Sequence, residues 1–467
     1  MIRTSDLRVL LVEDNEESKA ATVDDILSAL PGAEIAWAAD AESAIALVEG
    51  SQFDLAVCDL KIPARRGDLS TQESHGLRVV AEIQAHQPGT PIVILSGHGT
   101  VEKVDPYTAT ADVFPVLGAP RLPMCQAAVK GALVGFRSRL EPIRVGVGAL
   151  SAVDVTGGEE IDSMLERAIA QYAVGHGFST VEVAKASGLS GSINAVVVMR
   201  STDRPPKRVF VKVNRLDWVL DEVSRQKRFV EGFLEIANWA PTLEVVQAGL
   251  RDKGAYFSGL ATDPVDLFAL SDVSEENAVE AIARLDAVLL PWRMRESHTC
   301  SIGDLRRVHL PDAQVRELGM DLSEFVEIEE LEVVLEHAVT HGDLHGENIL
   351  VVEGLRPMLV DFAYTDVAPA ILDPVTLEMS FLFHPGSPLV RDGRVLRYEN
   401  WAEGNYLPDA RQQSVVERCR TWAVDGRDQR EFLAMSYAHA LRHLKRGDTV
   451  DPDHAMAVAR SAARSLS

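Results

Sequence analysis

The chain of 467 residues carries 46 Lys and Arg against 70 Asp and Glu, which gives a formal net charge of −24. This acidity opposes non-specific attraction to nucleic acid or to anionic membrane surfaces, so we expect neither as a partner. No apolar run approaches the roughly 18 residues that a membrane span needs, and the start lacks a signal-peptide stretch. The sequence therefore predicts a cytoplasmic protein of two to four domains, and its four dispersed cysteines signal neither disulfides nor zinc.

Short apolar runs alternate with helical patterns through the first hundred residues, as in RVLLVED, FDLAVCDL and PIVILSG. Such a βα series predicts a parallel sheet covered by helices on both faces, which is a doubly wound α/β fold. Polar residues follow three of the strands: Glu13 and Asp14, then Asp59, then Ser96. Because the carboxyl ends of parallel strands share one edge, these side chains should meet there, and clustered carboxylates suit Mg²⁺.

This pattern, with the segment DLKIP from Asp59 to Pro63, resembles a response-regulator receiver domain over residues 5–140. The resemblance implies a flavodoxin-like fold in which Glu13, Asp14 and Asp59 hold the metal and Asp59 accepts the phosphate. Ser96 would be the switch residue that contacts this phosphate. A sensor histidine kinase would be the phosphate source, and the domain could form a homodimer.

One feature of the receiver family is missing from the expected position. Where the family has a lysine before a proline after its fifth strand, the chain reads DVFPVLGAP, with Ala119 before Pro120. No lysine lies between Val104 and Val129. The sequence thus predicts a degenerate receiver whose phosphorylation is slow, dispensable or replaced by a structural role, since a cation that would contact the phosphate is absent.

Residues 141–175 are expected to form a linker and a bracing helix. Pro142 and a stretch rich in Gly and Val follow a helix-compatible segment, and a second helical pattern begins after Gly158. This change of composition places a domain boundary near residue 150.

The remaining residues, 176–467, are expected to form a second domain with a small lobe at about 176–260 and a large lobe at about 261–467. Two strand patterns flank a turn of small residues, Gly188, Ser190, Gly191 and Ser192. Such a turn can place backbone N–H groups over phosphates, although glycines in a hairpin turn usually serve only its backbone conformation. Lys212 lies in the next strand, and Glu222 lies on the helix that follows.

The segment HGDLHGENIL, residues 341–350, precedes an apolar strand that ends at Asp361. Phosphoryl transfer needs a carboxylate that orients the acceptor hydroxyl and oxygen ligands for magnesium, and Asp343, Asn348 and Asp361 can supply them. An HxDxH spacing also allows a zinc site that includes His341 and His345, but that interpretation leaves Asn348 and Asp361 without a role.

The HxDxHxxN pattern is similar to the aminoglycoside phosphotransferase and choline kinase family, which has a two-lobed, protein-kinase-like α+β fold. The resemblance implies an ATP- and Mg²⁺-dependent phosphotransferase in which Asp343 is catalytic and Asn348 and Asp361 hold the metal. Lys212 would bind the nucleotide phosphates, Glu222 would hold this lysine, and the Gly188–Ser192 turn would cover the phosphates.

The acceptor would be a hydroxyl-bearing small molecule or a protein. An acidic segment at residues 324–337 could form a pocket for cationic aminoglycosides, but acidic residues on a helix usually form a solvated face. Two alternatives to the enzyme stay open: a scaffold that binds nucleotide or partners without turnover, and an atypical protein kinase.

Overall fold

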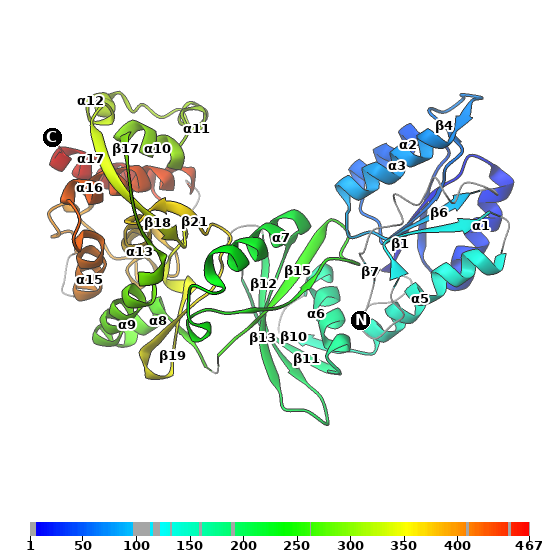
Figure 1. Ribbon diagram of the computed structural model, residues 1–467, viewed down its shortest axis with the longest axis horizontal. Coiled ribbons are helices and arrows are strands. Elements are labelled where there is room, and N and C mark those ends of the chain that lie inside the picture. Colours follow the sequence, from blue (N-terminus) through cyan, green and yellow to red (C-terminus); the bar gives the residue numbers. More distant parts are fainter. Residues whose placement is uncertain are drawn as a thin grey trace. The chain divides into compact units, whose positions relative to one another are not determined.

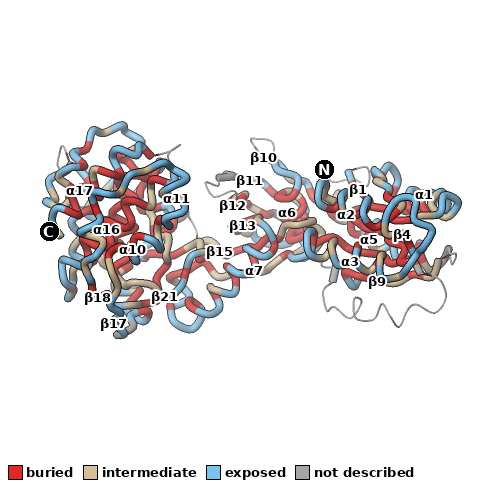
Figure 2. Tube along the Cα trace, turned by 90° about the horizontal axis from the view of Figure 1, so that it is seen from above, coloured by how far each residue is buried: buried red, intermediate tan, exposed pale blue. Residues whose placement is uncertain are grey.

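The computed structural model describes residues 6–96, 113–114, 122–130, 133–157, 161–187, 192–261, 263–407, 411–446 and 450–466. The chain forms two compact units (Figure 1). Unit 1 comprises Met1–Leu220 and Thr242–Leu260, and unit 2 comprises Asp221–Pro241 and Ala261–Ser467. The buried hydrophobic residues form one cluster in unit 2 and two clusters in unit 1. Figure 2 colours buried residues red and exposed residues pale blue along the chain. Among the described residues, none of the helices combines the length and the apolar character that crossing a membrane would require.

A five-stranded parallel sheet forms the N-terminal part of unit 1, in the order β2-β1-β3-β6-β9. Its strands are β1 (Arg8–Val12), β2 (Glu34–Ala38), β3 (Leu55–Asp59), β6 (Ile92–Ser96) and β9 (Cys125–Val129). The connecting helices include α1 (Glu16–Ala29), α2 (Ala41–Gly50) and α3 (Glu73–His86). Every residue of β3 is buried, as expected for a central strand covered on both faces. The predicted doubly wound, flavodoxin-like fold is confirmed.

The segment around Pro142 differs from the prediction. Cys125–Val129, expected to be helical, forms strand β9, and the next helix, α5 (Leu133–Ser151), continues through Pro142. Its apolar residues Phe136, Leu140, Ile143 and Val147 recur at helical spacing and are buried. This burial stabilises the helix although proline removes one backbone hydrogen-bond donor. Helix α6 (Ser163–Gly175) follows, and Asp162 caps its first turn.

A six-stranded sheet forms the second part of unit 1, in the order β10-β11-β12-β13-β15-β14. Its strands are β10 (Asp154–Gly157), β11 (Thr180–Ser187), β12 (Ile193–Arg200), β13 (Lys207–Arg215), β14 (Thr242–Val246) and β15 (Lys253–Gly259). All pairs are antiparallel except β10 with β11. One hydrophobic cluster includes residues of both sheets, for example Val9 and Val57 from the first and Val197 and Val211 from the second.

Asp54, Arg167 and Arg251 form a buried ion-pair group within unit 1, which we call the Asp54 cluster. Asp54 directly precedes β3, Arg167 lies on α6, and Arg251 lies in the turn between β14 and β15. Both arginines pair with the Asp54 carboxylate, and Arg251 does so through two nitrogens, at 2.7 and 2.9 Å. The pKa of Asp54 is lowered, because these arginines outweigh the opposing effect of burial.

Gly89 adds a backbone contact to this group. Its N–H donates to the Arg251 carbonyl at 2.7 Å, and its own carbonyl accepts from the Gly249 N–H at 2.8 Å. A Cβ atom at position 89 would lie 2.6 Å from the Arg251 carbonyl oxygen, so this approach requires glycine. The first sheet is thus joined to the β14–β15 turn by ion pairs and by main-chain hydrogen bonds.

Unit 2 is mainly helical and contains two small sheets. Its main helices are α8 (Leu267–Val273), α9 (Glu275–Val288), α10 (Ile302–His309), α13 (Leu372–Phe383), α15 (Gln413–Val424), α16 (Gln429–Arg442) and α17 (Pro452–Leu466). Shorter helices are α11 (Asp312–Glu317), α12 (Val326–Glu329) and α14 (Pro388–Arg391). One sheet has the order β17-β18-β21, with β17 (Arg293–Ser301), β18 (Glu332–Thr340) and β21 (Asp366–Pro369). The other has the order β16-β19-β20, with β16 (Val265–Asp266), β19 (Ile349–Val352) and β20 (Arg356–Leu359).

The sequence suggested that the acidic segment at residues 324–337 is one helix, and this prediction was wrong. The segment forms the short helix α12 and then enters strand β18. From Glu332 to Glu336 exposed and buried residues alternate, which is the period of a strand with one buried face. The mixture of sheets and helices expected for the second domain is nevertheless confirmed.

Candidate functional site

An acidic group forms at the carboxyl edge of the first sheet. Glu13 and Asp14 follow β1, and Asp59 ends β3, which pairs with β1. Ligand oxygens of all three residues lie within 4.8 Å of one another. Glu13 and Asp59 are buried, and the Lys61 N–H donates to Asp59 Oδ1 at 3.1 Å. Three clustered carboxylates fit the oxygen ligands that Mg²⁺ requires.

Lys130 contributes a cation to this group, so the prediction that the receiver lysine is missing was wrong. Its Nζ lies 2.6 Å from Asp59 Oδ2 and 2.8 Å from Glu13 Oε2. Lys130 directly follows β9, which is the fifth strand of the sheet. The sequence analysis sought this lysine in the segment DVFPVLGAP, residues 112–120, where the structure describes only β7 (Val113–Phe114), which pairs with β8 (Leu122–Pro123) outside the sheet.

Electrostatic contacts at this edge are reflected in two pKa shifts. Burial raises the pKa of Glu13 despite its bond to Lys130. The pKa of Lys130 is also raised, because hydrogen bonds to Asp59 and Glu13 outweigh the effect of burial. Ser96 ends β6 at the same edge, where it pairs with Val129, but its side chain lies outside the described residues.

The predicted nucleotide residues are found in several places. Lys212 lies at the centre of β13, opposite Asn194 on one side and Tyr256 on the other, and it is buried. Ser192 is buried at the start of β12, whereas Gly188, Ser190 and Gly191 lie outside the described residues. Glu222 is buried on α7 (Leu216–Arg225), a helix that begins in unit 1 and ends in unit 2.

The loop after β18 is held by a buried carboxylate from another helix. The backbone N–H groups of His341 and Gly342 donate to Asp373 on α13, at 2.8 and 3.0 Å. Burial raises the pKa of Asp373. Gly342 has a φ of 79°, and a Cβ atom there would lie 2.4 Å from the Tyr364 carbonyl oxygen. Asp373 therefore anchors the loop to α13.

Hydrogen bonds fix the positions of Asn348 and His341 in the loop. Asp361, after the hairpin, has an unusual backbone conformation. Asn348 Nδ2 donates to the Asp343 carbonyl at 2.9 Å, which leaves the amide oxygen of Asn348 available for another partner. His341 Nε2 contacts the Val360 carbonyl at 2.9 Å, so this histidine supports the loop. Asp361 has a φ of 63°, a left-handed conformation that a non-glycine residue rarely adopts and that is frequent at functional sites.

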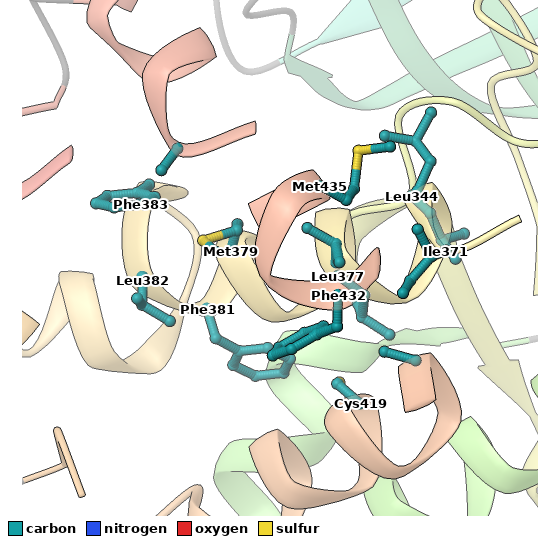
Figure 3. Close-up of a cluster of buried hydrophobic side chains, with 14 of the residues drawn as sticks. Leu344, Ile371, Leu377, Met379, Phe381, Leu382, Phe383, Cys419, Phe432 and Met435 are labelled. Atoms are coloured by element: carbon teal, nitrogen blue, oxygen red, sulfur yellow. The ribbon is translucent and has the colours of Figure 1, made fainter. Parts of the chain in front are cut away.

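The loop packs against the apolar core of unit 2 through Leu344. Leu344 contributes to the same buried cluster as Ile371 and Leu377 of the α13 region and Met435 of α16 (Figure 3). Leu344 thus holds the loop against α13 and α16. The polar residues on either side of Leu344 are therefore not needed to keep the loop in place.

Two family models match the sequence. The response regulator receiver domain matches residues 9–113, and the phosphotransferase enzyme family matches residues 185–407. The chain joins a receiver domain to a phosphotransferase domain. No curated protein sequence matches the chain significantly.

Solved structures resemble each part. The aminoglycoside phosphotransferase APH(4)-Ia is 12% identical, with 64% of this chain and 99% of that chain covered and a TM-score of 0.40. A ternary complex of a thermostable mutant of the same enzyme with ADP and hygromycin B is 13% identical, with 62% and 96% covered and a TM-score of 0.40. A CheY-like receiver domain from Methanospirillum hungatei is 23% identical, with 30% and 94% covered and a TM-score of 0.22.

The phosphotransferase domain contains one charged residue at the loop that the sequence did not predict. Arg442, the last residue of α16, places Nη2 3.3 Å from Asp343 Oδ1. His345 Nε2 lies 4.0 Å from the other oxygen of Asp343, and the ring of His345 stacks on that of His384. No local pattern links Arg442 to the loop, because 99 residues separate it from Asp343.

Proposed function

We propose that the phosphotransferase domain moves the γ-phosphate of ATP to a hydroxyl acceptor, and that the receiver domain accepts a phosphate at Asp59 from a sensor histidine kinase. The arrangement of Asp343, Asn348 and Asp361 in one loop and hairpin is the observation that carries the first part. The contact of Lys130 with Asp59 carries the second, since it supplies the cation that a phosphorylated aspartate needs. The domain boundaries given above, 5–140 and 176–467, belong to the same proposal.

In this mechanism the acceptor hydroxyl donates its hydrogen bond to Asp343, which orients the oxygen toward the γ-phosphorus and takes the proton. Asn348 would hold Mg²⁺ through its amide oxygen, and Asp361 through its carboxylate. Bound magnesium would neutralise charge on the transferring phosphate. Lys212 would bind the nucleotide phosphates, Glu222 would orient this lysine, and the Gly188–Ser192 turn would contact the phosphates through backbone N–H groups.

Glu13, Asp14 and Asp59 would hold a second Mg²⁺ in the receiver domain, with Ser96 as the switch residue. Lys130 would then pair with the phosphate that forms on Asp59. Whether a phosphate forms at this position can be measured by mass spectrometry after treatment with a small phosphodonor. The mass shift should disappear in Asp59→Asn.

Transfer from Mg²⁺–ATP by the purified full-length chain tests the kinase assignment. The acceptor panel should contain amino alcohols, sugars, sugar phosphates, hydroxy acids, aminoglycosides and proteins. Asp343→Asn should lower turnover by about 10²-fold or more, because it removes the proton acceptor. Glu353→Gln, at an exposed turn between β19 and β20, is the matched control and should retain turnover. Equal rates in wild type and Asp343→Asn would refute the assignment.

A further inference from the structure

A group of cations lies at the C-terminal end of α16, next to the proposed catalytic carboxylate. The helix ends at Arg442, and the 3₁₀ turn His443–Arg446 adds Lys445. The Arg442 and Asp343 side chains are 22% and 24% exposed, so both can be reached by a small molecule. Asp343 is the only carboxylate that pairs with Arg442 among the described residues.

Lys445 is exposed and has no carboxylate partner in the described part of the chain. Lys445 lies only three residues after Arg442, in the turn that directly follows α16. Partial burial and the charge of Arg442 lower the pKa of Lys445. His309, at the end of α10, faces the same group, and its ring lies 5.8 Å from that of His439 on α16. Burial and the charges of Arg442 and Lys445 lower the pKa of His309 to about 4, so it adds no charge at neutral pH.

Three of the six glutamates in the acidic segment at residues 324–337 are paired with arginines of unit 2. Glu329 pairs with Arg306 through two hydrogen bonds and accepts a third from the Tyr437 hydroxyl. Glu324 pairs with Arg460, and Glu336 lies 3.9 Å from Arg427. These three glutamates therefore stabilise the elements around them, whereas Arg442 pairs with Asp343 and Lys445 follows Arg442 in the next turn.

We propose that the acceptor is a small anion, in which a phosphate or carboxylate group accompanies the hydroxyl that receives the phosphate. Arg442 and Lys445 bind the anionic group, and this positions the hydroxyl at Asp343. This inference rests on the proposed function. The hydroxyl oxygen forms a bond to the γ-phosphorus, the bond from that phosphorus to the β–γ bridging oxygen breaks, ADP departs with this oxygen, and the hydroxyl proton passes to Asp343.

The geometry also explains why one arginine can serve both groups. Arg442 contacts Asp343 through Nη2, and a guanidinium carries five N–H donors, so other donors can reach an anion while this contact persists. Lys445 does not contact Asp343 and adds a second charge beside the first. A polycationic aminoglycoside would meet both positive charges, and this repulsion disfavours it as a substrate.

Binding of simple anions to the full-length chain tests the proposal independently of turnover. Inorganic phosphate and lactate represent the two anionic groups, and glycerol and ethanolamine are the neutral and cationic controls. Titration by calorimetry at constant, low ionic strength should show phosphate or lactate bound at least about tenfold more tightly than either control. The anion that binds more tightly identifies the group as phosphate or carboxylate.

Three variants assign the binding to this end of α16. Arg442→Gln should weaken anion binding about tenfold and Lys445→Gln about threefold, since the lysine is more exposed. Arg430→Gln removes the same charge from the exposed opposite end of the helix and should bind as wild type does. Arg442→Gln could weaken binding only because Arg442 supports Asp343. Lys445 does not contact Asp343, so weaker binding in Lys445→Gln must come from a lost contact with the anion.

Anion binding that is absent, or unchanged in both Arg442→Gln and Lys445→Gln, overturns the inference. So does efficient phosphate transfer to a cationic acceptor with none to sugar phosphates or hydroxy acids, although that result would uphold the kinase. A chain that shows no thermal stabilisation by Mg²⁺–ATP and no turnover overturns the proposed function instead. The two failures are therefore distinguishable.

Discussion

The receiver edge and the phosphotransferase loop each hold a carboxylate against a cation, but the two pairs differ in burial. Lys130 reaches Asp59 and Glu13 at 2.6 and 2.8 Å, and these carboxylate side chains are only 8% and 0% exposed. Arg442 reaches Asp343 at 3.3 Å, and both side chains are about a quarter exposed. The first pair belongs to the interior of its domain, whereas the second lies where a small molecule can rearrange it.

The two regions also differ in their balance of charge. At the receiver edge, Glu13, Asp14 and Asp59 face one ammonium group, so these four residues leave two negative charges, which a divalent cation would neutralise. At the loop, Asp343 faces Arg442, with Lys445 beside them, so these three leave one positive charge. On the proposed assignments, similar ion pairs serve one site that takes a metal and another that takes an anion.

If burial decides how much such a pair contributes to stability, the Asp54 cluster should give the largest effect. Asp54→Asn would leave two largely buried guanidinium groups with less charge compensation. We expect a loss of about 3–5 kcal/mol in the unfolding free energy of unit 1, measured by hydrogen exchange of β3 and β15 amides. Asp24→Asn, at an exposed position of α1, should change it by less than about 0.5 kcal/mol. A loss below about 1 kcal/mol would contradict the role of burial.

The pH dependence of the same variant provides a sharper test. The pKa of Asp54 is lowered in the folded state from its ordinary value of 3.8, so its stabilising effect is complete above that value. The effect is lost as the pH falls through the folded-state pKa. The stability difference between wild type and Asp54→Asn should therefore be constant from about pH 7 to about pH 5 and should shrink below about pH 4. A difference that grows on acidification would reverse the assigned sign.

Lys130→Gln should give the next largest effect. It leaves the Glu13 and Asp59 carboxylates facing each other at low exposure, but the lysine itself is 28% exposed, so water can compensate in part. We expect a loss of about 2 kcal/mol from the receiver domain, measured by hydrogen exchange at β3 and β6. Lys61→Gln is the control, since Lys61 is exposed and lies two residues after Asp59, at the same edge of the sheet. Equal stability of the two variants would contradict a structural role for Lys130.

The same two regions show which parts of a site can be predicted from sequence. Glu13, Asp14 and Asp59 were identified because strand ends share one sheet edge, and Asp343 and Asn348 because they are five residues apart in one loop. The cations were missed because Lys130 is 71 residues from Asp59 and Arg442 is 99 residues from Asp343.

Lys130 could have been identified if CQAAV had been interpreted as a strand. A short, mostly apolar segment is equally compatible with a strand and with part of a helix, so periodicity did not decide between them. Only the pairing of β9 with β6 settles the register that places Lys130 at the acidic edge. The β18 strand was misassigned for a related reason, because glutamates favour helices while its buried face required the period of a strand.

The stabilisation of the receiver domain by bound Mg²⁺ should be smaller than the losses expected for Asp54→Asn and Lys130→Gln. At about ten times its dissociation constant, Mg²⁺ should stabilise the wild-type receiver domain by about 1.4 kcal/mol, and Asp14→Asn should lose this response. Lys130→Gln should bind Mg²⁺ more tightly than wild type, because no ammonium competes for Glu13 and Asp59. Asp24→Asn should respond as wild type does. Binding that is weaker in Lys130→Gln would show that the lysine orders the metal ligands and does not compete with the metal.

The smallest effect on stability should come from Arg442→Gln. Its pair with Asp343 is partly solvated and longer than the pairs of Lys130, so we expect a loss of less than about 1 kcal/mol from unit 2, measured by hydrogen exchange of the α13 and α16 amides. Arg430→Gln, at the exposed start of α16, sets the baseline for removing a charge from this helix. A loss of stability as large as that of Lys130→Gln would show that Arg442 mainly stabilises the loop. The buried Lys130 pair and the partly exposed Arg442 pair would then not differ in their contribution to stability. A small loss with a large change in anion binding would instead show that this arginine is maintained for the ligand.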